Sequence, residues 1–206
     1  ANPPAAAVPP AIITTPPPAA APEDDGDGDG DGDGDPLAQT FIVKNTSTTT
    51  GQFITKMDIF FESKDPVLGV LLQIRTVENG FPSSHVMPNG EVHLRSADVD
   101  VSTDGTTATT FTFPAPVFLR SGLEYCFVLK PDANNPNYNI YVRKTGDTDI
   151  TTNTIINQDN FEGLMFLSTN NRAWRPYQQE DVKFTIYRAE FNASDGSVDY
   201  QNADHE

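Results

Sequence analysis

The 206-residue chain has one cysteine, one tryptophan and only 13 lysines and arginines. A single cysteine excludes an internal disulfide, and a loop-rich chain without disulfides favours assembly in a reducing cytosol. The sequence also lacks a run of about 18 apolar residues, so we expect no transmembrane helix and no membrane insertion. The opening Ala1-Asn2-Pro3-Pro4 has neither a Met nor a basic region, which is unlike a signal peptide.

Positive charge is scarce relative to negative charge. The chain has 29 aspartates and glutamates, a formal net charge of −16 and a pI near 4.3. A surface with this excess of negative charge repels phosphate groups. We therefore expect no nucleic-acid partner.

The first 35 residues differ in composition from the rest of the chain. Residues 1–22 are rich in Ala and Pro, which predicts an extended, polyproline-II-like linker, with a docking peptide for an aromatic groove as the alternative. Residues 23–35 alternate Asp with Gly and predict an acidic spacer. The positions of its acids do not fit the twelve-residue EF-hand calcium loop, which leaves weak calcium association as the alternative. Residues 192–206 are acidic and turn-rich and predict a C-terminal tail.

Residues 36–191 carry the pattern of short strands. Turn residues separate the apolar runs, and no segment has the periodicity of an amphipathic helix. The prolines of Pro114-Ala115-Pro116 argue against a central strand there. We predict an all-β antiparallel sandwich, jelly-roll-like, with about nine or ten strands. The alternating sets are Phe53, Thr55, Met57, Ile59 and Phe61; Val70, Leu72 and Ile74; and Tyr125, Phe127 and Leu129.

Residues able to carry chemistry are few. Cys126 lies in a run that is apolar on both faces, which favours an inert buried thiol over a nucleophile. Asp98, Asp100 and Asp104 precede Gly105 and offer carboxylates for a calcium ion, with a solvated loop as the alternative. No other cofactor is indicated. No catalytic constellation is visible, so we expect the chain not to be an enzyme.

Aromatic residues near loops are the better candidates for binding. Tyr138, Tyr141, Trp174 and Tyr177 lie in or beside predicted loops, and an aromatic ring can stack on a sugar. Nearby side chains such as Arg143 can donate hydrogen bonds to hydroxyl groups. We predict a glycan or partner site at Tyr141, Arg143, Trp174 and Tyr177. The alternative for Trp174 is that it plugs one end of the sandwich.

An ordered set of motifs runs along the predicted domain. It comprises Asp35-Pro36-Leu37-Ala38-Gln39-Thr40-Phe41; Met57 to Asp65; Gln73-Ile74-Arg75 with Asn79-Gly80-Phe81-Pro82; Thr110 to Phe113 with Pro116-Val117 and Gly122 to Tyr125; and Gly163 to Phe166 with Asn170, Trp174 and Lys183 to Ala189. This set resembles a module of large structural proteins in tailed bacteriophages, especially cyanophage-like ones.

The resemblance implies a non-catalytic virion structural or adhesion module of a tail, baseplate or neck. It implies other virion proteins as partners and a location in the virion after assembly in the host cytoplasm. A homo-oligomer is left open. The alternative from the residues is an extracellular carbohydrate-binding jelly-roll module that recognises a host surface glycan.

Overall fold

A computed structural model describes residues 36–44, 50–133, 135–144, 146, 155, 163–168 and 170–191. The predicted segments 1–22, 23–35 and 192–206 lie outside this part. The described part is almost entirely β, which confirms the predicted fold class, and its one helical element is the short 3-10 turn η1 (Ser96–Asp98). Within this part, no helix is long and apolar enough to cross a membrane.

The described strands number thirteen rather than nine or ten, because several of those predicted are divided into short pieces. They are β1 (Leu37–Ile42), β2 (Gly51–Ile59), β3 (Phe61–Ser63), β4 (Val70–Glu78), β5 (Phe81–Leu94), β6 (Thr109–Arg120), β7 (Glu124–Pro131), β8 (Asn139–Ile140), β9 (Val142–Lys144), β10 (Met165–Leu167), β11 (Arg175–Tyr177), β12 (Glu180–Val182) and β13 (Phe184–Arg188).

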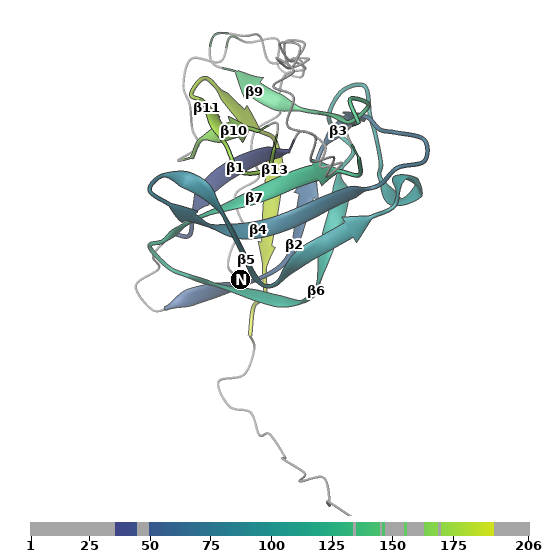
Figure 1. Ribbon diagram of the computed structural model, residues 1–206. Helices are drawn as coiled ribbons and strands as arrows, with labels where there is room; N and C mark the ends of the chain where they lie inside the picture. The colour runs from purple at the N-terminus through teal and green to yellow at the C-terminus, as the bar shows by residue number, and fades with distance from the viewer. Residues whose placement is uncertain are drawn as a thin grey trace, which may run out of the picture.

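Two main antiparallel sheets form the sandwich (Figure 1). The large sheet has six strands in the order β11-β10-β1-β7-β4-β5, and the small sheet has three in the order β13-β2-β6. Two further pairs, β12-β9 and β3-β8, continue the strands β13 and β2. Consecutive strands pass repeatedly from one sheet to the other, as expected of a jelly-roll-like chain, whereas β4 and β5 form a hairpin within the large sheet.

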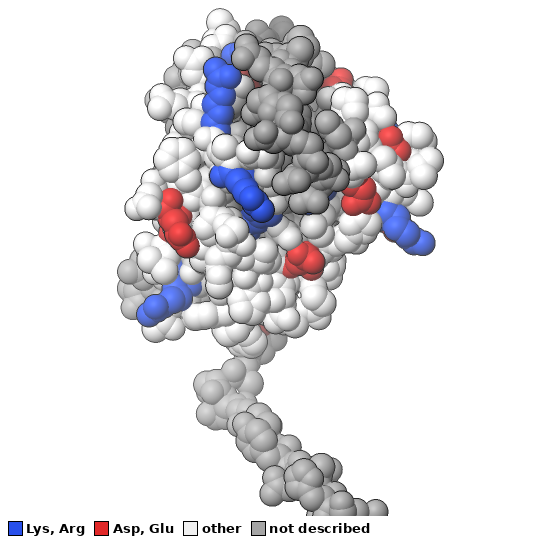
Figure 2. All heavy atoms as spheres, in the orientation of Figure 1, with Lys and Arg blue, Asp and Glu red and all other residues white. Residues whose placement is uncertain are grey.

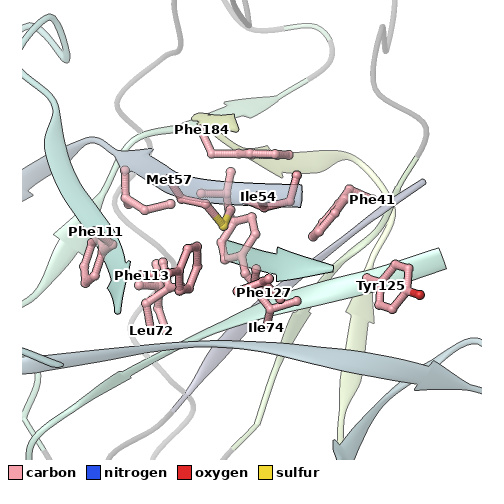
Figure 3. Packing of buried hydrophobic residues seen from close by; sticks show 14 of the residues in the cluster. Phe41, Ile54, Met57, Leu72, Ile74, Phe111, Phe113, Tyr125, Phe127 and Phe184 are labelled. Carbon is pink, nitrogen blue, oxygen red and sulfur yellow. The ribbon is translucent and has the colours of Figure 1, made fainter. Parts of the chain in front are cut away.

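Side chains from both sheets fill the space between them (Figure 3). The alternation predicted for β4 and β7 is confirmed, because Leu72, Ile74 and Phe127 are all fully buried. Phe127 meets Phe184 of the small sheet edge-on, with ring centroids 5.0 Å apart. Aromatic pairs in this geometry stabilise a core beyond their buried area. The two sheets are therefore joined by close packing at the centre of the sandwich.

The alternation predicted for β2 fails in its first half. The register of β2 against β6 shifts between Ile54 and Lys56, a β-bulge. A bulge of this kind exchanges the two faces of a strand. Ile54 therefore points into the core at 2% exposure, whereas Phe53 is 37% exposed. The prediction that Phe53 shares the buried face of Met57 is wrong for this reason.

The prolines of β6 lie in an edge strand, in agreement with the expectation that no central strand contains Pro114-Ala115-Pro116. β6 is continuous through Pro114 and Pro116, both of which are exposed. It lies at one edge of the small sheet, and the register shift against β2 falls at the prolines. Proline lacks a backbone N–H, so edges and bulges are the places where a sheet accepts it.

A tight turn before β4 is organised by one carboxylate. Asp65 accepts hydrogen bonds from the backbone N–H groups of Leu68 and Val67, both at 2.8 Å, and from Asn137 Nδ2 at 2.8 Å. These bonds favour the ionised form, and they lower the pKa of Asp65 to about 2, with the Leu68 N–H as the largest cause. The turn is thus tied to the loop before β8.

We expect the contribution of Asp65 to stability to depend on pH. Its folded-state pKa is below the ordinary value of about 3.9, so its contribution is complete above about pH 4 and is lost as pH falls toward 2. Asp65→Asn should therefore lower the urea midpoint at pH 6 and differ less from wild type at pH 2.5. Asp98→Asn is the control, because Asp98 is exposed and pairs with Arg95 on the surface. An equal deficit of Asp65→Asn at both pH values would contradict this account.

Candidate functional site

A second hydrophobic cluster covers the outer face of the large sheet, away from the central core. Its fully buried members are Ala38 on β1, Cys126 and Val128 on β7, and Phe166 on β10. The members on β1 and β7 point outward, because the residues that alternate with them along these strands, such as Phe41 and Phe127, face the core. Partly buried Val77, Leu164 and Trp174 pack against them. We call these seven residues the outer cluster.

Trp174 reaches the outer cluster from the loop between β10 and β11. In this loop Asn170 Oδ1 accepts hydrogen bonds from the N–H groups of Arg172 (3.0 Å) and Ala173 (2.7 Å). Asn171 has a positive φ of 57°, a conformation that asparagine tolerates better than most residues. These local bonds fix the chain just before the indole. Trp174 is partly buried and packs at the surface of the cluster.

A second aromatic ring borders the same cluster. Phe81 follows the tight Asn79-Gly80 turn, in which both residues have positive φ (53° and 81°). Its ring centroid lies 5.7 Å from that of Phe166, and 46% of its surface is exposed. The β4–β5 hairpin therefore places a phenyl ring over the cluster on which Trp174 also packs.

Planar polar groups form a network beside these rings. Arg75 is buried, with 4% of the residue exposed. Its guanidinium donates from Nε to Gln73 Oε1 (2.9 Å) and from a terminal nitrogen to Asn171 Oδ1 (2.9 Å). Gln73 in turn donates to Glu91 Oε2 at 2.5 Å. Hydrogen bonds among buried or half-buried groups hold each other in one arrangement. Trp174, Phe81, Arg75, Gln73 and Asn171 together are the outer-face site.

The four predicted binding residues do not form one surface. Trp174 packs on the outer cluster, whereas Tyr177 of β11 packs against the central core, with the Arg175 guanidinium 5.9 Å from its ring centroid. Arg143 lies on β9, where its register partner is Asp181 of β12. The two aromatic side chains thus belong to opposite faces of the large sheet.

The prediction that Tyr141 offers an exposed ring is wrong. Tyr141 is fully buried, and its hydroxyl donates a short hydrogen bond to the Ser102 carbonyl. Its ring lies against Gly105, where an added Cβ would come within 3.0 Å of the ring atoms. Burial raises the pKa of the Tyr141 hydroxyl. Tyr141 supports the loop before β6 and is not available to a ligand.

The three predicted calcium ligands are not gathered around one point. Asp98 pairs with Arg95 Nε at 2.9 Å, and Asp104 accepts hydrogen bonds from Thr106 N (3.1 Å) and Oγ1 (2.8 Å). Asp100 is exposed beyond η1. Within the described ranges no three His, Cys, Asp or Glu side chains are close enough to share a metal ion. The predicted site at Asp98, Asp100 and Asp104 is therefore not formed.

Cys126 behaves as the sequence predicted. It is fully buried in the outer cluster, and burial raises the pKa of its thiol to about 12. A thiol reacts as its thiolate, so Cys126 is protonated and inert at neutral pH.

Sequence reasoning missed Arg75, Phe81 and Asn171. The alternation of Val70, Leu72 and Ile74 could have placed Arg75 on the outer face, since odd and even positions of a strand face opposite ways. Phe81 stands between the turn residues Asn79-Gly80 and Pro82, so the alternation of a strand does not assign it to a face of a sheet. Its contact with Phe166 joins residues 85 positions apart, for which the local pattern holds no information.

Charged groups on the face seen in Figure 2 are scattered among uncharged side chains, with basic and acidic residues interspersed. No protein-family model, curated protein or solved structure matches the chain. The function is therefore inferred from the side-chain geometry and from the resemblance of the motifs.

Proposed function

We propose that this chain is a non-catalytic structural or adhesion module of a bacteriophage tail or baseplate. The sandwich acts as a stiff body, joined to an Ala/Pro-rich and Asp/Gly-rich segment whose composition is typical of a spacer. Its partners are other virion proteins, copies of itself among them. Its place is the virion, after assembly in the host cytoplasm.

The observation that carries the proposal is where the phage-like motifs fall in the fold. Their apolar residues are scaffold residues: Ile59, Ile74, Phe111, Phe166 and Phe184 are each at most 2% exposed. Their turn residues sit at tight connections between strands, as at Asn79-Gly80 and Gly122. The motifs thus coincide with the parts that specify one sandwich, which supports a shared structural module.

The test is the composition of purified particles. Virions from a culture that carries this sequence should be separated from free protein on a density gradient and digested with trypsin. We expect the peptide Ser96–Arg120 to sediment with the capsid and tail proteins in a fixed ratio. Its presence only in the soluble fraction would overturn the proposal.

We infer carbohydrate binding at the outer-face site as a second candidate function. The observation that favours it is that two partly exposed rings, Trp174 and Phe81, both pack on the outer cluster. The hydrogen-bonded polar groups of Gln73, Arg75 and Asn171 belong to the same site. Binding sites of this kind combine aromatic faces with a few fixed polar groups. The adhesion role and this one are compatible in a single protein.

We expect Trp174→Ala to weaken glycan binding at least about tenfold, because a central aromatic anchor contributes well over 1 kcal/mol. Glycan arrays identify a ligand, and calorimetry then measures its Kd for wild type and variant. Phe118→Ala is the matched control, since Phe118 is a 39% exposed ring on the small sheet. Equal losses in both variants, or no glycan bound by the wild type, would contradict the carbohydrate function.

A further inference from the structure

Three phenylalanine rings lie exposed in a row on the small sheet, outside both hydrophobic clusters. Phe53 on β2 has its ring centroid 5.0 Å from that of Phe118 on β6 and 5.4 Å from that of Phe191, which follows β13. Their exposed fractions are 37%, 39% and 67%, respectively. We call these three residues the Phe patch. The bulge in β2 creates it, because the bulge turns Phe53 outward.

The size of the Phe patch restricts what can cover it. With about 200 Å² of surface for each ring, the exposed fractions correspond to roughly 300 Å². A stable interface between two folded proteins buries about 800 Å² on each partner. The Phe patch is too small for such an interface and suits a short apolar peptide.

We propose that the Phe patch is the docking site of the chain's own residues 1–22, which lie outside the described part. This segment contains eight prolines and no charged residue. Proline-rich peptides dock on aromatic side chains through a polyproline-II conformation that is largely formed before binding, so little entropy is lost. An uncharged, proline-rich peptide is therefore a suitable ligand for this exposed aromatic surface.

Charge supports the same occupant. Two exposed arginines lie beside Phe53: Arg120 is the register partner of Gly51 on β2, and Arg188 is the register partner of Ile54. Exposed Glu190 offsets part of their positive charge. The segment that follows residues 1–22 carries eight acids between positions 23 and 35. An acidic spacer next to a neutral, proline-rich peptide complements a small apolar patch flanked by arginines.

The chain is long enough for this contact. The turn after β6 links the end of β1 to the start of β2. Gly122 N donates to the carbonyl of Val43, just after β1, at 2.7 Å, and Ser121 N donates to the carbonyl of Thr50, just before β2, at 3.0 Å. The end of β1 therefore lies near the start of β2 and the Phe patch. β1 itself spans about 20 Å. A flexible spacer of 13 residues has a root-mean-square length of about 20 Å. The effective concentration of a tethered peptide at this range is millimolar, so weak docking suffices.

Paramagnetic broadening in the full chain tests the proposal. A nitroxide is attached to Ala11→Cys; Cys126 does not compete, since it is buried and its thiol is protonated. We expect the amide peaks of Phe53, Phe118 and Ala189 to lose at least half their intensity. In the double variant Phe53→Ser/Phe118→Ser, the amide peaks of positions 53, 118 and 189 should keep their full intensity.

The matched control is Val67→Ser/Leu68→Ser, which removes two exposed apolar side chains (79% and 37% exposed) from the loop before β4. It should leave the broadening unchanged, and circular dichroism is the check that both double variants fold. Phe191→Ser, which lies outside any strand, provides a second variant that should reduce the broadening by at least about twofold.

Four outcomes would overturn the proposal. The first is an absence of broadening at the Phe patch, and the second is broadening that persists in Phe53→Ser/Phe118→Ser. The third is broadening of equal strength in isotope-labelled chains that lack the nitroxide when they are mixed with spin-labelled chains, since the segment would then occupy a second copy. Self-association through the Phe patch is detected by sedimentation velocity and counts against the proposal in the same way. Each result is independent of glycan binding and of virion composition.

Discussion

Phe127→Ala should lower the free energy of unfolding by about 3–5 kcal/mol, because it removes a fully buried ring from the centre of the core. The ring meets Phe184 of the opposite sheet and stands among side chains of both sheets in Figure 3. Its loss leaves a cavity that rigid strands on either side cannot close. Urea unfolding, followed by the fluorescence of the single Trp174 and by circular dichroism, measures the change.

Phe118→Ala is the control for Phe127→Ala, since it makes the same chemical change at a ring that is 39% exposed. We expect a loss of about 1 kcal/mol or less there. Phe127→Leu should give an intermediate loss in the free energy of unfolding. It allows the comparison to be made even if Phe127→Ala does not fold. Equal effects of Phe127→Ala and Phe118→Ala would show that the core does not lie between the two sheets as described.

Gln39→Leu should cost about 2–4 kcal/mol, because Gln39 is a fully buried link between β1 and β12. Its Nε2 donates to Asp181 Oδ1 at 3.0 Å, and its Oε1 accepts from Val182 N at 3.0 Å. Leucine has a similar volume but leaves the Val182 N–H without this acceptor and removes one partner of the buried Asp181. Gln178→Leu, at an exposed position in the turn before β12, should change stability by less than about 0.5 kcal/mol.

Gln39→Glu separates the hydrogen bonds of Gln39 from its volume. It places a second carboxyl beside Asp181, and two carboxylates in one buried site raise the pKa of one of them. A carboxyl whose pKa is raised by folding does not destabilise the fold through its charge below its unfolded-state pKa, where it is protonated in both states. Stability is lost as pH rises from that value through the folded-state pKa. The deficit of Gln39→Glu relative to wild type should therefore be larger at pH 7 than at pH 4.5. A deficit that does not change with pH would contradict the contact with Asp181.

Local patterns predicted the parts of the fold that depend on neighbours in sequence. The alternation in β4 and β7 identified which side chains enter the core. Cys126 was predicted to be buried because its strand is apolar on both faces. In each case the information lies within a few residues of the feature.

The failures involve contacts between distant residues or a change of register. The bulge at Ile54 exists because β2 pairs with a proline-containing stretch of β6, some 60 positions away, and it reverses the face of Phe53. Tyr141 was predicted to be exposed because it lies beside a predicted loop, yet its ring packs against Gly105. Only one member of the predicted site, Trp174, lies in the outer-face site. Its partners Arg75 and Phe81 come from another part of the chain.

The prolines of β6 have a consequence for crowded assemblies. An exposed sheet edge offers a row of N–H and C=O groups to which a strand of another molecule can add, and such growth leads to fibres and aggregates. Pro114 and Pro116 provide no N–H, and they lie where β6 bulges at the edge of the small sheet. Many copies held side by side would therefore remain separate bodies along this edge instead of fusing into a continuous sheet.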